Sequence, residues 1–518
     1  MISFVQRLGA MVLGVLSGFD RIRLRGTLPR LSNTGSFYRW LEASKIRLTD
    51  FSSHAQSQTA QLREALEATA AEAGRPVEYL AGYNNKEQLV QQRLQHDGAA
   101  ANGLVCAFST LENCSSYDVF KNPKTHRLDL RRRPRKCLHY YFYFIDTRFG
   151  LAQVRLQTWF PYNTHVVLNG REWLARELDK TGIGYQRRDN CFTWIEDFAQ
   201  AQELADRQTA IPWDTELDRL VRRVLPPRQL WLPEDWYYWT AEQTEWATDL
   251  AFRDADTLAE LYPPLIRRGI ESFGSEDVLR FLGHRVSASG HVPASLKAEV
   301  TSDLKHRPEG VRIKHRAGRN TVKLYDKQGS VLRVETTLND VTGLKSYRTT
   351  AQDPEGPRQW RPMRKSVVEM GRRAELSQAS NDRYLEALGT LPTDTPLCRV
   401  SAPLCQPVES NGRRYRALNP LAPEDHRLLA AVSRGEWLVM GFRNRDIRQA
   451  LYGAAPDPAT QRRQAAAVTR LLGLLRAHGL IKKIPRTHRY LLTTHGTAVI
   501  PALLGANNAP LKQLAGAA

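Results

Sequence analysis

Residues 138–197 have the sequence LHYYFYFIDTRFGLAQVRLQTWFPYNTHVVLNGREWLARELDKTGIGYQRRDNCFTWIED. Residues 138–146 are aromatic and apolar up to a terminal aspartate, which predicts a buried strand. Residues 151–159 alternate apolar and polar side chains, as a paired strand does. A break at Pro-Tyr-Asn precedes a third strand at residues 164–168. This stretch therefore predicts three successive strands, the first of which ends at Asp146.

A helix is predicted after the third strand at residues 171–180, and Gly182 ends it. A short strand or hairpin at residues 185–194 and a helix opening at Glu196 follow. The order strand, strand, strand, helix, strand, helix resembles the RNase H-like nucleases and transposases, which also carry acids at a strand end and on a following helix. This resemblance rests on topology and implies a mixed sheet that supports metal-dependent chemistry on nucleic acid.

Four acids of this region are the predicted catalytic residues. A two-metal nuclease needs several converging carboxylates, because Mg²⁺ or Mn²⁺ prefers oxygen ligands. Asp146 and Glu172 are expected to meet, since the helix packs back onto the sheet, and Asp189 or Asp197 would add a third carboxylate. Asp146, Glu172 and Asp189 are the predicted metal ligands. In the alternative interpretation Asp146 caps a turn, Glu172 favours a helix N-terminus and Asp189 pairs with a neighbouring arginine.

Two acids nearer the N-terminus are rivals for the leading catalytic position. Asp20 follows an apolar segment, residues 8–19, which is short for a membrane span and is predicted to be buried core. Its alternative role is that of a turn residue paired with a neighbouring arginine. Glu112 ends a predicted strand at residues 103–109. Helices are expected in between these two acids, at residues 34–44, 53–73 and 86–94.

The charge balance indicates a polyanionic partner. The chain has 74 Lys and Arg against 54 Asp and Glu, a net charge of +20, and a pI near 9.8. Nucleic acid, DNA or RNA, is the commonest partner of such a chain, although general basicity is the alternative. None of the six cysteines forms a CxxC pair or stands at zinc-ligand spacing, which favours a reduced, cytoplasmic protein without a structural zinc site and without a membrane span.

A basic cluster stands directly before the first strand of the opening stretch. Lysine and arginine neutralise backbone phosphates without recognising a base sequence, and the aromatic residues that follow at 139–141 suit stacking on unpaired bases. A solvated loop is the alternative. The predicted nucleic-acid-binding residues of this cluster are Arg131, Arg132, Arg133, Arg135 and Lys136.

The middle of the chain, residues 212–283, is predicted to be helical and rich in aromatic residues. Trp239, Gln243 and Trp246 would share one helix face by their spacing. Such aromatic residues are expected to form core, with base stacking as the alternative.

Residues 296–340 predict a meander, because turn signals at 317–320 and 326–329 divide three strands. Its piece at 323–335 is similar to a stretch of phage and plasmid replication initiators, which nick DNA with a tyrosine and a metal held by paired histidines. The chain lacks a His-x-His pair, so the nicking chemistry is not carried over and Tyr325 is an ordinary strand residue. One face is expected to carry a basic band of Arg312, Lys314, Arg316, Lys323 and Lys327, of which the first four are predicted to bind nucleic acid.

The C-terminal region predicts three helices, at 423–432, 445–451 and 460–478, and then a hairpin at 481–492. This pattern resembles the winged-helix DNA-binding domains, in which the third helix enters the major groove and the wing touches the backbone. A protein-interaction module is the alternative. The resemblance implies DNA contacts by Arg462, Arg463 and Arg470 on the helix and by Arg486 and Arg489 on the wing.

The chain is thus expected to be a multidomain α/β protein. We predict a metal-dependent nuclease or transposase of a mobile genetic element, targeted by the winged helix. The alternative is a non-catalytic DNA- or RNA-binding protein, such as a replication initiator, a regulator or a ribonucleoprotein component. The expected domains are an α/β domain with an RNase H-like core at 1–210, a helical domain at 211–295, a meander with a helix at 296–375, a linker at 376–420 and a winged helix at 421–518.

Overall fold

The computed structural model of the chain divides into two compact units, each assembled from separated segments rather than from one contiguous block. Unit 1 comprises the N-terminal segment to residue 13, residues 252–334 and the chain from residue 379. Unit 2 comprises residues 14–251 and 335–378. The structure describes residues 4–508 except 83, 98–101, 226–235, 285–298, 308–309, 351, 390–400, 411, 438–440 and 485–486.

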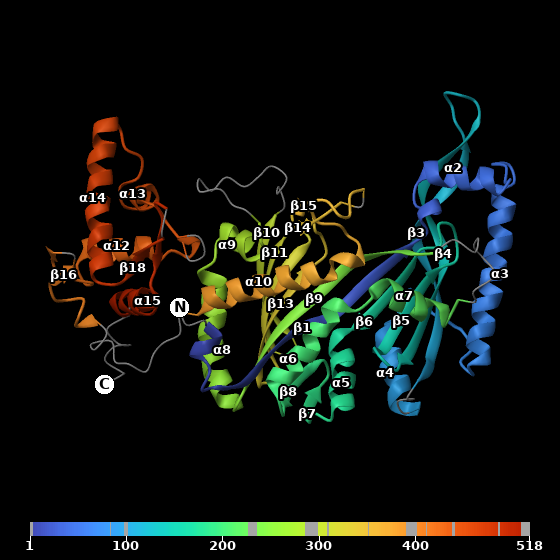
Figure 1. Cartoon of the computed structure of the whole chain (residues 1–518), viewed down its shortest axis with the longest axis horizontal. Helices are drawn as coiled ribbons and strands as arrows, with labels where there is room; N and C mark the ends of the chain where they lie inside the picture. Colours follow the sequence, from blue (N-terminus) through green and yellow to red (C-terminus); the bar gives the residue numbers. More distant parts are fainter. Residues whose placement is uncertain are drawn as a thin grey trace. The chain divides into compact units, whose positions relative to one another are not determined.

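Unit 2 is organised around a sheet with the strand order β13-β9-β1-β6-β5-β4-β3-β2. The pairs β1–β6, β6–β5, β5–β4 and β4–β3 are antiparallel, and the short β2 is parallel to β3. Figure 1 shows the long strands β1 and β9 side by side. The strands are β1 (Val12–Thr27), β2 (Glu78–Tyr79), β3 (Gly103–Lys121), β4 (Leu128–Asp146), β5 (Gly150–Gln157), β6 (Thr164–Asn169), β9 (Tyr238–Phe252) and β13 (Val331–Leu338).

The helices of unit 2 form where the sequence predicts them. Helix α5 begins after Asn169, whose side chain accepts hydrogen bonds from two backbone N–H groups of the first turn, and it ends at Gly182, which has a φ of 72°. The Cβ of any other residue at Gly170 would lie 2.2 Å from the carbonyl oxygen of Phe19, so α5 starts in close contact with β1. The helices are α2 (Thr34–Ala43), α3 (Phe51–Glu72), α4 (Lys86–Asp97), α5 (Gly170–Thr181), α6 (Phe198–Asp206) and α7 (Trp213–Arg222).

The segment expected to have RNase H-like order contains the predicted elements in the predicted sequence. After α5, however, β7 (Tyr185–Arg188) and β8 (Cys191–Ile195) pair only with each other and form a separate hairpin. Among the described residues between β6 and β9, none forms a strand of the main sheet. The sheet is mixed, as expected, but this hairpin departs from the topology that the resemblance implies.

The predicted helix through Trp239 and Trp246 is wrong, because these residues belong to strand β9. Within β9, the buried Trp239 and Ala241 lie on either side of the half-buried Thr240, and the buried Thr244 and Trp246 lie on either side of the half-buried Glu245, which is the period of a strand. Pairing with strands on both sides outweighs the helical spacing of the aromatic residues. The prediction that the tryptophans form core is confirmed, since Trp239 and Trp246 are buried.

The same order of elements occurs twice along the chain. A long strand is followed by helices, a four-stranded meander and a further helix, and in each case the first strand pairs with the last strand of the meander. The first copy also has the short β2 among its helices, and the second has a hairpin, Lys345–Arg348 with Gln359–Pro362, before its last helix. The first copy runs from β1 to α5, and the second runs from β9 to α10 (Met370–Leu388). Because β1 also pairs with β9, the first strands of the two copies are neighbours in the sheet.

Unit 1 contains the rest of the second copy. The predicted meander is confirmed and has one more strand than expected; β10, β11 and β12 pair antiparallel in sequence order. His315 on β11 is buried and contacts the hydroxyl of Tyr384 on α10, with 2.9 Å between its Nε2 atom and the oxygen. The elements are α8 (Ala255–Glu271), α9 (Ser275–Phe281), β10 (Val300–Arg307), β11 (Gly310–Ala317) and β12 (Asn320–Lys327).

The C-terminal module has the predicted three helices followed by a hairpin. Its buried core includes Leu429, Ile447, Val468 and Leu475, and an isolated β-bridge between Phe442 and Tyr490 joins the segment before α13 to the hairpin. The elements are α12 (Pro423–Val432), α13 (Asn444–Tyr452), α14 (Pro458–Ala477), β18 (Ile481–Lys483), β19 (Tyr490–Leu492) and a further helix, α15 (Thr494–Asn508).

Candidate metal centre

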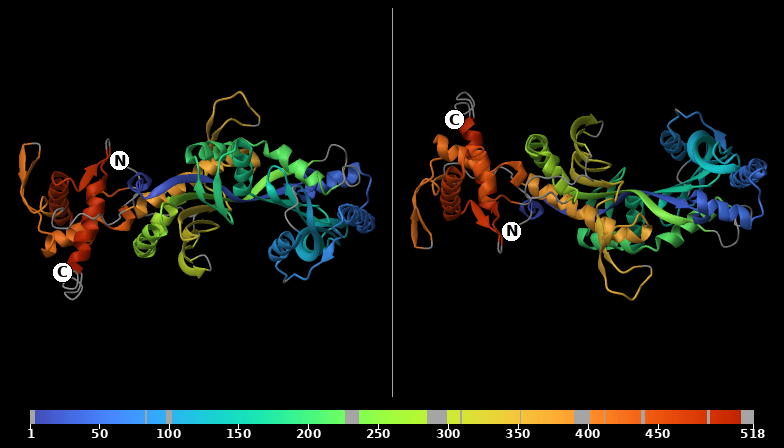
Figure 2. Two further views of the ribbon diagram at one scale, coloured as in Figure 1. Left: turned by 90° about the horizontal axis from the view of Figure 1, so that it is seen from below. Right: turned by 90° about the horizontal axis from the view of Figure 1, so that it is seen from above.

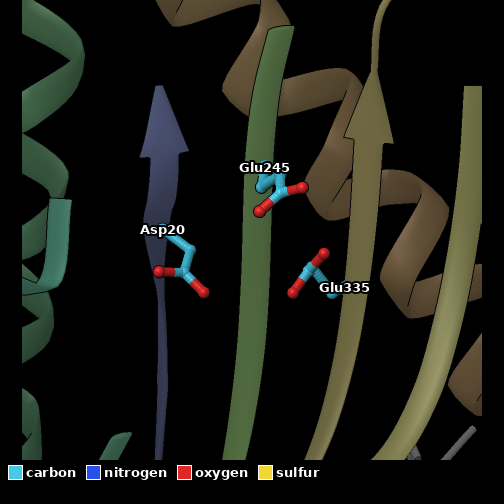
Figure 3. Close-up of side chains that lie close together, drawn as sticks. All are labelled: Asp20, Glu245 and Glu335. Carbon is cyan, nitrogen blue, oxygen red and sulfur yellow. The ribbon is translucent and has the colours of Figure 1, made fainter. Parts of the chain in front are cut away.

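Three carboxylates from three adjacent strands converge in unit 2. Asp20 lies on β1, Glu245 on β9 and Glu335 on β13, and Figure 3 shows their side chains directed toward one another. One oxygen from each lies within 4.8 Å of the other two. Neighbouring strands are about 4.8 Å apart, so Asp20 and Glu335, whose strands lie on either side of β9, come this close only because their side chains are directed toward the middle strand (Figure 3). Among the described residues this is the only group of histidine, cysteine and acidic side chains with metal-ligand spacing.

Two of the three carboxylates accept hydrogen bonds from amide side chains. Asn190, in the turn between β7 and β8, donates its amide to both oxygens of Asp20, at 2.9 and 2.7 Å. Gln243 donates to Glu245 at 2.9 Å from the same strand. Asp20 and Glu335 are only 3% and 2% exposed, whereas Glu245 is half-buried and faces a cavity. The donor set of three carboxylates matches the oxygen preference of Mg²⁺ and Mn²⁺.

A cavity of about 330 Å³ adjoins two of these carboxylates. Asp20 and Glu245 form part of its wall, together with Asn190, Leu168 and residues of α4. A second cavity, of about 270 Å³, shares five lining residues with the first and therefore adjoins it. The shared residues are Arg21, Glu87, Tyr143, Gln153 and Val167.

The second cavity has a basic wall. Four cations line it with a single acid, Glu87; they are Arg21, Arg23, Lys86 and Arg155. Of the two adjoining cavities, the first therefore contains the carboxylates Asp20 and Glu245, and the second is mainly basic. Arg155 and Lys86 are 16% and 15% exposed, which places both cations inside the cavity rather than in bulk solvent. Both pair with Glu112, at 2.6 and 3.5 Å, so two cations share one carboxylate. A further anion beside them is favoured, because solvent screens their charge only weakly.

The basic wall is built on a network of ion pairs. Arg155 binds Glu112 at 2.6 Å, and Arg23 lies 3.4 Å from Glu242. Burial would raise the pKa of Glu242, but a hydrogen bond from His165 and the charges of His165 and Arg23 outweigh it and lower the pKa to about 2. Burial lowers the pKa of His165. Glu242 therefore stays ionised and pairs with Arg23, which lines the second cavity.

Asp146, the predicted leading ligand, has a structural role. It is fully buried and accepts hydrogen bonds from Arg219, at 2.8 and 3.1 Å, and from Arg223 at 3.1 Å. The backbone N–H groups of Arg148 and Phe149 complete its shell. Burial would raise its pKa, but these hydrogen bonds lower it to about 2. Asp146 thus connects the β4–β5 turn to α7. Its hydrogen bonds from the turn's backbone correspond to the alternative interpretation, in which Asp146 caps a turn.

The other predicted acids do not join Asp146 in a metal-ligand group. Glu172 pairs with Arg187, and Asp197 caps α6 by accepting the backbone N–H of Gln200 at 2.9 Å. Asp189 occupies the β7–β8 turn with a φ of 56°. These four acids fail to converge because β7 and β8 pair with each other instead of entering the sheet. As a result, Glu172 on α5 meets Arg187 on β7, and the β7–β8 turn places Asn190 beside Asp20. Asp189 is nevertheless adjacent in sequence to Asn190, which binds Asp20.

The two rival acids both lie at the site. Asp20 is one of the three converging carboxylates, and Glu112 anchors Arg155 beneath the basic wall. Glu245 and Glu335 are absent from the sequence-based predictions. Glu335 could have been found, because an acid within a strand whose every residue is buried calls for a functional or structural reason.

Two of the predicted basic clusters are grouped in space. On the β3–β4 hairpin, Arg131 and Arg133 both pair with Asp118, and Arg135 stacks over Trp159 with 4.0 Å from its guanidinium carbon to the ring centroid. On the meander, Lys314 faces Lys323 directly across β11 and β12. Burial and then the charge of Lys323 lower the pKa of Lys314. The predicted positive band therefore exists, with Arg312 and Arg316 on the same strand.

The basic residues of the C-terminal module divide between surface and structure. Arg462, Arg463 and Arg470 are exposed on α14. Arg489 is partly buried and donates to the carbonyl of Gly441 at 2.9 Å, which ties the hairpin to the segment before α13. Arg486 lies outside the described residues.

A larger cavity, of about 760 Å³, lies beside α7. Its titratable groups serve the fold, since Asp218 accepts the indole N–H of Trp239 at 2.8 Å and Arg219 binds Asp146. Burial raises the pKa of Asp218. Asp214 also lines this cavity, and burial and then the charge of Asp218 raise its pKa. The wall thus has two carboxylates, one fewer than the group of Asp20, Glu245 and Glu335.

Within the described part of the chain, every helix is too short or too polar to cross a bilayer. Comparison of the chain with protein-family models, with curated proteins and with solved structures gave no match.

Proposed function

We propose that this chain is a nucleic-acid-binding protein that cleaves or transfers phosphodiester bonds with a divalent cation at Asp20, Glu245 and Glu335. The observation that carries the proposal is the convergence of these carboxylates beside a cavity that adjoins a second, mainly basic cavity. A phosphodiester substrate suits this polarity, because its negative phosphates need cationic partners on the protein and a cation at the reacting bond.

Each group has a role in this proposal. Mg²⁺ or Mn²⁺ at the three carboxylates would neutralise the reacting phosphate and lower the pKa of an attacking water. Asn190 and Gln243 hold Asp20 and Glu245 in the orientation that binds the cation. Arg21 and Arg155 bind the neighbouring phosphate, so that the strand is oriented with respect to the carboxylates.

The basic surfaces supply affinity for the rest of the nucleic acid. The net charge of +20 and the exposed arginines of the β3–β4 hairpin favour backbone contacts without sequence preference. The C-terminal module, with its basic α14 and hairpin, acts as the winged-helix element that binds duplex DNA.

The test is cleavage of labelled single-stranded DNA, duplex DNA and RNA with Mg²⁺, with Mn²⁺ and with a chelator. The wild type is expected to cleave at least one substrate only with the cation present. Asp20→Asn and Glu335→Gln keep the side-chain shape but remove a ligand charge, so cleavage should fall to the level seen with the chelator. Glu203→Gln, an exposed carboxyl on α6, is the matched control and should cleave like the wild type.

The alternative of a non-catalytic binding protein makes a different prediction. It requires that the wild type bind nucleic acid but cleave none of the substrates, or that Asp20→Asn and Glu335→Gln retain cleavage. Arg155→Gln separates substrate binding from the reaction. In the proposed site this variant raises KM more than it lowers kcat, because Arg155 lines the basic cavity, away from the carboxylates.

A further inference from the structure

An exposed aromatic pair stands on a small hairpin of unit 2. Strands β14 (Lys345–Arg348) and β15 (Gln359–Pro362) pair only with each other, and their register places Tyr347 opposite Trp360. Both views of Figure 2 show the hairpin, in golden orange, projecting from the surface. Tyr347 and Trp360 are 55% and 58% exposed, and their ring centroids lie 5.4 Å apart. Two large rings side by side in solvent form an apolar patch, which commonly marks a binding surface.

The aromatic pair is held rigidly. Arg372 on α10 donates from Nε to the carbonyl of Lys345 at 3.0 Å, and its guanidinium lies 5.3 Å from the centroid of Trp360. Arg348 donates to the carbonyl of Pro362 at 3.2 Å. The rings are therefore presented on a fixed surface, and a ligand that stacks on them would not have to order a flexible loop first.

The surroundings of the pair are basic. Between residues 345 and 372 the chain has seven Lys and Arg against three acids. One of these acids, Glu369, is already shared by Arg348 and Arg364, at 3.3 and 3.2 Å. The patch therefore combines aromatic faces with excess positive charge, which complements a ligand that carries both flat rings and negative charge.

We propose that Tyr347 and Trp360 form a platform on which unpaired bases of a single-stranded nucleic acid stack, while the surrounding arginines and lysines neutralise its phosphates. Base–aromatic stacking tolerates any sequence, because every base has a π face. Bases in a duplex already stack on one another, so the platform selects single strands over duplexes. The platform is separate from the three carboxylates, so it binds without a divalent cation and does not depend on the proposed chemistry.

The test is fluorescence anisotropy of labelled oligothymidylate, and of a labelled duplex, with full-length protein in the presence of EDTA. Loss of one stacked base costs roughly 1–3 kcal/mol, so Tyr347→Ala and Trp360→Ala should each weaken single-strand binding by about 5- to 150-fold. Trp360→Phe keeps a stacking face and should restore most of the affinity. Duplex binding should change less than twofold.

The exposed aromatic residues Tyr79 and Trp194 provide controls, since Tyr79→Ala and Trp194→Ala remove rings that are 66% and 38% exposed elsewhere on unit 2. Both should bind oligothymidylate like the wild type. The proposal is overturned if Tyr347→Ala and Trp360→Ala bind the single strand as tightly as the wild type. An equal loss of single-strand and duplex binding would also overturn it, because charge or folding would then explain the defect.

Discussion

Replacing Asp146 by asparagine should destabilise the protein without altering its chemistry. The carboxylate accepts three hydrogen bonds from Arg219 and Arg223 and two from backbone N–H groups. These bonds lower its pKa from 3.8 to about 2, and one pKa unit corresponds to about 1.4 kcal/mol, so the ionised form adds about 2 kcal/mol to the free energy of unfolding at pH 7. Asp146→Asn should lose about this amount.

The pH dependence has a definite sign. Because the pKa of Asp146 is lower in the folded protein than in the unfolded chain, its stabilisation is complete above about pH 4 and is lost as the pH falls toward 2. Urea unfolding should therefore give a difference in the free energy of unfolding between the wild type and Asp146→Asn that is constant near neutral pH. This difference should shrink below pH 4.

Glu203→Gln is the control for the loss of an exposed carboxyl and should unfold like the wild type. If Asp146→Asn is as stable as the wild type at pH 7, the structural role of Asp146 is refuted. If it folds normally but loses cation-dependent cleavage, Asp146 belongs to the reaction after all.

Three further predictions follow from particular contacts. Gly170→Ala should lower the free energy of unfolding by roughly 1–3 kcal/mol or more, measured by urea unfolding, because the new Cβ would meet the carbonyl oxygen of Phe19 at 2.2 Å. The Sγ atoms of Cys114 and Cys137 lie 2.8 Å apart, so diamide should oxidise these two thiols to a disulfide, detected by peptide mass mapping and abolished in Cys114→Ser. Nucleic-acid affinity should fall on the order of a hundredfold between low and moderate salt, and a flat salt response would contradict the role of the basic surfaces.

Much of the secondary structure was predictable from local patterns. The strands β4, β5 and β6 and the helices of the C-terminal module show clear periods and end signals, such as Asn169 and Gly182 around α5. Strand β9 was not predictable in this way, because Trp239, Gln243 and Trp246 also fit a helical spacing. Its pairing with β1 and β13 decides the conformation, and that pairing involves residues far away in sequence.

The candidate site was predictable only in part for the same reason. Asp20 is noticeable because it follows an apolar run, and Glu112 because it ends a strand. Glu245 and Glu335 become neighbours of Asp20 only through the strand order of the sheet. In that order β9 lies between β1 and β13, although the three strands are far apart in sequence. Asp146 was misleading, since a strand-ending aspartate satisfied by two arginines has the same sequence pattern as a metal ligand.

Direct measurement of cation binding tests the central claim without requiring knowledge of the substrate. Mn²⁺ is titrated with the full-length protein and followed by electron paramagnetic resonance. The signal of free Mn²⁺ decreases as the ion binds to the protein. Wild-type protein is expected to bind Mn²⁺ at a site that Mg²⁺ competes for, and Glu335→Gln and Asp20→Asn are expected to lose that site, whereas Glu203→Gln and Asp146→Asn keep it. Equal Mn²⁺ binding by wild type and Glu335→Gln would contradict the assignment of Asp20, Glu245 and Glu335 as the metal centre.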